Sequence, residues 1–85
     1  MGLKEKIMAE VPEEFKGVHE YMDLSEMAEH EGHHHIAKIL KDVAHEEYTH
    51  GSMMMCILRD LHEPIPEHFH EHKMKAHHKL YGGVE

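Results

Sequence analysis

One stretch of the chain, from Ile36 to Leu61, constrains the fold more than any other part. Its apolar residues recur in steps of three and four, the spacing of a helix that buries one face. Continued through the middle of the stretch, the same spacing reaches Glu47 and His50. We call these eight positions the predicted stripe, and they predict one long helix over about 34–62. The apolar members of the predicted stripe are Ile36, Leu40, Val43, Met54, Ile57 and Leu61.

The sequence Glu47-Tyr48-Thr49-His50 is a Glu-x-x-His motif inside this helix. Residues three apart share one helix face, so the stripe predicts that Glu47 and His50 point inward with the core. Burial of an ionised carboxylate without a partner is costly, and a bound metal ion would compensate it. Without a metal, Glu47 could instead form a buried polar network with Glu14 and His50 that fixes the register of a dimer.

A second helix is predicted before this one, over about 12–31. Pro12 suits the first turn of a helix, and acidic residues directly after it favour the positive end of the helix dipole. The apolar residues of this helix have a mean direction that coincides with position 14, so Glu14 shares the core-facing stripe. Gly17 weakens the helix locally. The apolar residues are Phe15, Val18, Tyr21, Leu24 and Ala28.

The ends of the chain add shorter elements around this pair of helices. Residues 1–11 predict a separate short amphipathic helix before Pro12, and residues 67–79 predict a polar, loosely packed helix within the His-rich segment 67–85. A short turn around Gly32 makes the two long helices antiparallel neighbours. The prediction is therefore one all-α domain over 1–85, with a core hairpin at about 12–62 and short flanking helices.

The amino-acid composition indicates which binding partners the protein can have and where in the cell it is expected. The 85 residues carry a formal charge of -8, which argues against nucleic acid or an anionic membrane. Thirteen histidines make charge and metal affinity depend steeply on pH below 7. The single cysteine and the absence of a long apolar run predict a cytoplasmic protein without a membrane span. So small a chain buries little surface alone, so association with a second copy is expected.

The hairpin presents Glu14 from the first long helix and Glu47 with His50 from the second. Three ligands are too few to enclose a pair of metal ions, but two hairpins related by a two-fold axis supply four Glu and two His. This is the ligand set of di-iron and di-manganese carboxylate bundles. Oxygen and imidazole ligands suit iron first, and manganese or zinc also fits.

These residues resemble the ferritin-like superfamily, and its rubrerythrin branch most closely. The interval of 33 residues between Glu14 and Glu47 is similar to the family's own ligand spacing. The resemblance implies that Glu14 is a terminal ligand, Glu47 a bridging carboxylate and His50 the nitrogen ligand. The matching positions, between about 14 and 61, are Glu14, Tyr21, Glu31-Gly32, Ile36-Ala37-Lys38-Ile39, Ala44 and Glu47-x-x-His50.

The resemblance also implies an activity, an assembly and a partner. Family members react a diferrous centre with dioxygen or peroxide, so a ferroxidase or a rubrerythrin-like peroxidase is expected. The chain holds only one hairpin, which implies a homodimer or higher oligomer similar to the short encapsulated ferritins. It lacks the Cys-x-x-Cys module of full-length rubrerythrin, which implies that electrons come from an external donor.

Two other functions fit the same residues. The first is a His-rich buffer that stores zinc, nickel or copper without redox turnover, using pairs four apart such as His30 with His34 and His68 with His72. It predicts that metal affinity survives the loss of Glu47. The second is a metal-free helical dimerisation module, which predicts that Glu47→Leu leaves the dimer intact or more stable.

Overall fold

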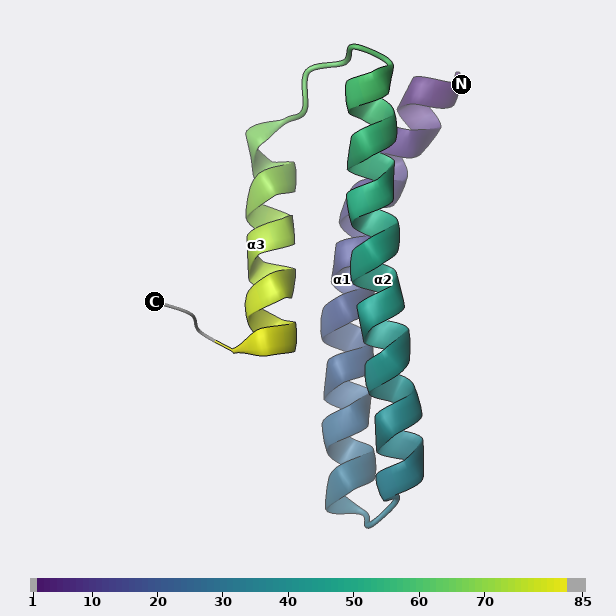
Figure 1. Cartoon of the computed structure of the whole chain (residues 1–85), viewed down its shortest axis with the longest axis vertical. Coiled ribbons are helices and arrows are strands. Elements are labelled where there is room, and N and C mark those ends of the chain that lie inside the picture. Colours follow the sequence, from purple (N-terminus) through teal and green to yellow (C-terminus); the bar gives the residue numbers. More distant parts are fainter. Residues whose placement is uncertain (1, 83–85) are drawn as a thin grey trace.

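The computed structural model describes residues 2–82, and this part of the chain forms three α-helices and no strands. Helix α1 spans Leu3–His30, α2 spans His34–Asp60 and α3 spans Glu67–Tyr81. Helices α1 and α2 form a long antiparallel hairpin, and α3 lies along one side of it (Figure 1). The all-α hairpin is therefore as the sequence predicts. No helix in residues 2–82 is long and apolar enough to cross a membrane.

A short turn between α1 and α2 sets their antiparallel arrangement. Gly32 has a φ of +84°, a backbone conformation that glycine adopts without steric cost. The amide of His33 donates to the carbonyl oxygen of Ala28 over 2.8 Å, and the amide of Gly32 donates to that of Glu29 over 3.0 Å. These bonds satisfy carbonyl groups that the end of α1 would otherwise leave free.

The predicted helix break at Pro12 is wrong, because α1 runs through Pro12 without interruption. Proline removes one helical hydrogen bond and crowds the preceding turn, a cost of about 3 kcal/mol in a helix interior. The continuous helix nevertheless buries Val11 completely and packs Ile7 and Met8 against the core. Tertiary packing of this first segment thus outweighs the local cost of proline.

The core of the chain also differs from the predicted stripe. Ile36 is 50% exposed and Leu61 39% exposed, and none of the other stripe positions is fully buried. The buried face of α2 lies to one side of the stripe. Its small residues, Ala37, Ala44 and Gly51, recur every seven residues and let α1 approach closely. The buried residues of α2 are Ala37, Ala44, Gly51, Met55 and Leu58.

A core side chain of α1 lies directly against the backbone of α2 at Gly51. A Cβ atom on Gly51 would lie 2.7 Å from Cε1 of Phe15, whose side chain is almost fully buried. The aromatic ring therefore occupies the space that any other residue at position 51 would need. Gly51 is less favourable in a helix than other residues, but its missing side chain leaves room for the Phe15 ring in the core.

We expect Gly51→Ala to lower the free energy of unfolding by up to about 2 kcal/mol. Overpacking against Phe15 costs about 1–3 kcal/mol, and the better helix propensity of alanine offsets about 1 kcal/mol of it. Urea unfolding of the metal-free protein at fixed concentration measures the difference. In a Phe15→Leu background Gly51→Ala should no longer lower the free energy of unfolding, because the smaller side chain leaves room for the methyl group. If the effects of the two substitutions on this free energy simply add, the assigned contact between positions 15 and 51 is wrong.

Helix α3 is better packed than its composition predicts. Phe69, Ala76 and Leu80 are buried and belong to the same core cluster as Val11 and Phe15. At the polar edge, Nζ of Lys79 lies 2.7 Å from a carboxylate oxygen of Asp23 on α1. The prediction of a loosely packed third helix is therefore wrong, because three apolar residues on one face are enough to dock it on the hairpin.

Candidate metal centre

Glu14, Glu47 and His50 come together midway along the hairpin. One candidate ligand atom from each residue lies within 4.8 Å of the other two. Nδ1 of His50 is 3.5 Å from a carboxylate oxygen of Glu14 and 3.5 Å from one of Glu47. We call these three residues the trio. Because α1 and α2 are antiparallel, positions about equally distant from the turn face one another, and this places the trio together.

A glycine on α1 makes room for the Glu47 carboxylate. A Cβ atom on Gly17 would lie 2.8 Å from Oε2 of Glu47 and 3.2 Å from its carboxyl carbon. Glu47 therefore lies against the bare backbone of α1, one turn from Glu14. The sequence showed Gly17 only as a weak point of the helix. A glycine within an otherwise regular helix was the available signal for this close approach.

In the single chain the carboxylates of Glu14 and Glu47 are largely covered, whereas His50 is about half-exposed, so the predicted burial of His50 in the core is not met within one chain. The side chains of Glu14 and Glu47 are 19% and 23% exposed, and that of His50 is 51% exposed. No charged or polar residue is buried in residues 2–82. Helix α1 packs on the small residues beside the predicted stripe, so the stripe lies at the edge of the core, with Ile36, His50 and Leu61 exposed and the other five positions partly buried.

Helix α3 contacts a different side of α2 from the one that carries Glu47 and His50. Tyr48 follows Glu47 directly and contacts α3 through His77. Successive residues of a helix point about 100° apart, so Tyr48 is rotated by about 100° from Glu47 and by about 160° from His50. We call the side of the hairpin that carries the trio and is not covered by α3 the open face.

The surroundings of Glu14 disfavour the charged form of its carboxyl group. Partial burial raises the pKa of Glu14 above its ordinary value of 4.5, and the neighbouring Glu47 carboxylate raises it further, both by charge repulsion and by hydrogen bonding. His50 acts in the opposite direction and lowers this pKa. A cation placed between the carboxylates would remove the repulsion, so the electrostatics of the apo protein favour binding of a positive ion.

We expect Glu14→Gln to stabilise the metal-free protein at pH 7. The pKa of Glu14 is higher in the folded state, so the protonated Glu14 side chain favours folding. Its contribution to the free energy of unfolding is complete below about pH 4.5 and is lost as pH rises through the folded-state pKa, where the charged form is penalised and glutamine is not. The gain in melting temperature should therefore shrink as pH falls and vanish near pH 4.5. Thermal unfolding with chelator present measures it, with exposed Glu13→Gln as the matched control. An equal gain in both variants would contradict the assigned repulsion.

The donor set of the trio fits a divalent transition metal. Two carboxylates and one imidazole are ligands typical of iron, manganese and zinc, and three ligands leave coordination positions open. No other group of three His, Cys, Asp or Glu side chains in residues 2–82 converges in this way. His68 and His72 lie with ring centroids 5.9 Å apart and form only a pair.

The fold and the trio define an all-helical protein with a candidate site for a metal ion. Comparisons with protein families, with curated proteins and with solved structures find no match to this chain. The assignment of an activity therefore depends on the residues of the site and on the surface around them.

Proposed function

We propose that the chain is one half of a di-iron carboxylate protein. Two copies pair through their open faces, and their two trios together supply four Glu and two His to two iron ions. The observation that carries this proposal is the convergence of Glu14, Glu47 and His50 within 4.8 Å on a face that the chain leaves uncovered.

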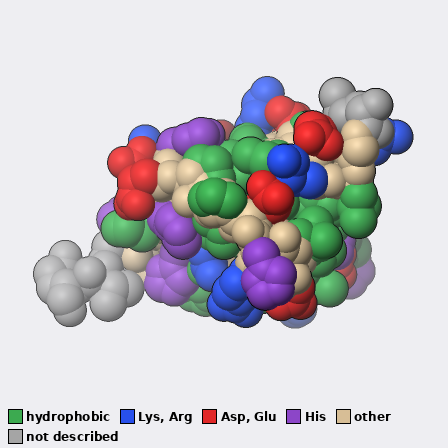
Figure 2. Space-filling model, turned by 90° about the horizontal axis from the view of Figure 1, so that it is seen from above, with side chains coloured by type: hydrophobic (Ala, Val, Ile, Leu, Met, Phe, Trp, Pro, Cys, Tyr) green, Lys and Arg blue, Asp and Glu red, His purple; other side chains and the backbone are tan. Residues whose placement is uncertain are grey.

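The surroundings of the trio suit contact with a second copy. Leu24 on α1 is 44% exposed and Ile36 on α2 is 50% exposed, and by helical periodicity both lie on the open face. Hydrophobic side chains also reach the surface at the end of the molecule seen in Figure 2. Apolar residues on both sides of a charged centre are complementary to the same face on a two-fold related copy. Pairing would cover the positions of the predicted stripe that the single chain leaves exposed or only partly buried.

The residues of the trio have distinct tasks in this proposal. The carboxylates of Glu14 and Glu47 balance the positive charge of the metal ions, and His50 supplies a nitrogen ligand. Gly17 has no side chain, which leaves the space that the Glu47 carboxylate occupies against α1. Bound iron supplies the redox chemistry with dioxygen or peroxide, and the protein supplies ligand geometry.

Anaerobic loading of the apo protein with Fe(II), followed by exposure to oxygen, tests this function. We expect saturation at one iron per chain, a dimer by native mass spectrometry, and a ferric–oxo absorbance that develops after oxygen is admitted. Uptake of several zinc or nickel ions per chain without oxidation would favour the His-rich buffer. A dimer that binds no metal would favour the dimerisation module and would refute the di-iron centre.

A further inference from the structure

Helix α3 is a positively charged element in an acidic protein. It contains three lysines and five histidines against two glutamates, which gives it a net charge of +1 with neutral histidine, whereas the whole chain has a net charge of -8. Figure 2 shows histidine and lysine side chains next to one another on one part of the surface. The positive groups are therefore concentrated on the helix that leaves the open face uncovered.

Two hollows lie along the seam between α1 and α3, and they adjoin at His19 and Lys75, which line both. The larger hollow, of about 570 Å³, is also lined by Met74 and Lys79. The smaller hollow, of about 270 Å³, is also lined by His72. We call the two hollows together the cationic groove. The larger volume is within the range of sites for small organic ligands, about 300–1,000 Å³.

Few acidic side chains balance the charges of the cationic groove. Nζ of Lys79 lies 2.7 Å from a carboxylate oxygen of Asp23, and Glu13 lines the smaller hollow. Neither His19 nor Lys75 forms an ion pair within residues 2–82. The two residues at the junction of the hollows therefore have no carboxylate partner in the described part of the chain.

The positive groups at this junction disfavour one another. Partial burial lowers the pKa of His19 below its ordinary value of 6.5, and three nearby positive groups lower it further. These groups are Lys79, His72 and Lys75. Asp23 acts in the opposite direction and raises the pKa of His19. An anion placed at the junction would remove the repulsion, just as a cation would between the carboxylates of the trio.

We propose that the cationic groove binds the phosphate group of a small organic phosphate. The phosphate lies between His19 and Lys75, and the rest of the ligand extends along the larger hollow past Met74. A phosphate monoester carries a charge of about -1.5 to -2 at pH 7 and has three acceptor oxygens, so it pairs with several separate positive groups where a carboxylate has one charge. Lysine is a common phosphate ligand because its charge is compact. This inference does not depend on the proposed di-iron function, and it assigns a task to α3, which contributes no residue to the trio.

Calorimetric titration of the whole chain tests the site. Metal ions are first removed with a chelator and the protein is desalted, because phosphate also binds iron. The probes are phenyl phosphate, inorganic phosphate and benzoate. We expect one phenyl phosphate per chain, bound at least about fivefold more tightly than either other probe, because only phenyl phosphate combines two charges with an apolar ring.

The three probes separate the possible ligands. Equal affinities for phenyl phosphate and inorganic phosphate would overturn the organic ligand and assign the groove to the free anion. Equal affinities for phenyl phosphate and benzoate would overturn the preference for phosphate. Absence of phosphate binding would overturn the site, and no iron is present in the experiment, so none of these results bears on the di-iron centre.

A lysine on another side of α3 supplies the matched control. Lys75→Gln removes a charge from the cationic groove, whereas Lys73→Gln removes the same charge beside Tyr48, outside both hollows. We expect the affinity for phenyl phosphate to fall about tenfold or more in Lys75→Gln, the loss of one charge-assisted hydrogen bond. It should stay within about twofold in Lys73→Gln, because salt screens exposed charges outside the site. Equal weakening in both variants would mean that net charge alone attracts the anion and would overturn the assigned site.

Two further measurements locate the bound phosphate. Asp23→Asn should raise the affinity severalfold, because it releases Lys79 from its ion pair and removes a negative charge; a lower affinity in this variant would contradict the assigned place of the anion. Nuclear magnetic resonance should show that phenyl phosphate raises the pKa of His19 by about 1, because a nearby negative charge favours the protonated ring. The His19→Gln variant identifies the signals of this ring. An unchanged pKa of His19 with phenyl phosphate bound would refute a site at the junction of the two hollows.

Discussion

Glu47→Ala is expected to lower iron affinity by about a hundredfold or more and to abolish the ferric–oxo absorbance. Loss of a partner in the outer shell of a metal site alone typically costs 10–100-fold in affinity, and this change removes a ligand. In a symmetric dimer the substitution acts twice, so two of six ligands are lost. Iron bound per chain, measured after anaerobic loading and desalting, checks the result.

The neighbouring residue supplies the control for this experiment. Glu46 is exposed, whereas Glu47 contributes to the trio. Glu46→Ala changes the net charge equally and should leave iron uptake and oxidation unchanged. Equal uptake by both variants would refute the di-iron centre and would favour affinity located in the histidines. Removal of the charge by Glu47→Leu should leave a dimer intact or more stable if the trio has only a structural role.

Dissociation of the proposed dimer is the expected result of placing charges on the open face. Leu24 and Ile36 are about half-exposed in the single chain, so the double variant L24E/I36E should leave each hairpin folded. In the dimer it would bury four unpaired carboxylates, and one uncompensated buried charge costs about 3–5 kcal/mol. We therefore expect the dissociation constant to rise by at least about a thousandfold. Sedimentation velocity at micromolar concentration measures the change.

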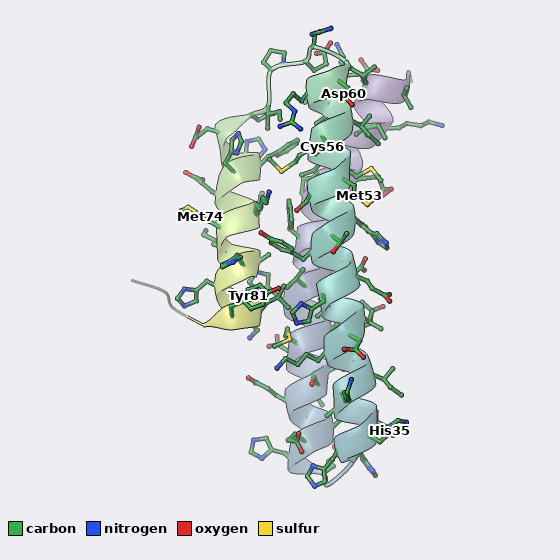
Figure 3. All side chains as sticks on the ribbon, viewed as in Figure 1. His35, Met53, Cys56, Asp60, Met74 and Tyr81 are labelled. Carbon is green, nitrogen blue, oxygen red and sulfur yellow. The ribbon has the colours of Figure 1, made fainter. Side chains whose placement is uncertain are left out.

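A charge on the outer face of α3 is the matched control. Met74 is 69% exposed and points away from the hairpin (Figure 3), so Met74→Glu should leave the dimer unchanged. Iron uptake should fall together with the dimer in L24E/I36E, because one trio alone offers three ligands. A double variant that stays dimeric, or that binds iron normally as a monomer, would contradict pairing through the open face.

Local features of the sequence determined the elements and the position of the site along them. Helical spacing from Ile36 to Leu61 predicted α2 to within two residues, and Gly32 predicted the turn. The interval between Glu14 and Glu47 placed them at similar distances from that turn, and the structure brings them together. These features depend on periodicity and on the backbone freedom of glycine, which act over a few residues.

Tertiary packing decided which face of each helix is buried. Gly51 and Gly17 allow a close approach that the apolar pattern does not reveal, and this approach moves the core beside the predicted stripe. Packing also keeps α1 continuous through Pro12 and docks α3 through Phe69. Each result depends on contacts between residues far apart in the sequence, where the fit of one side chain against another backbone outweighs local preference.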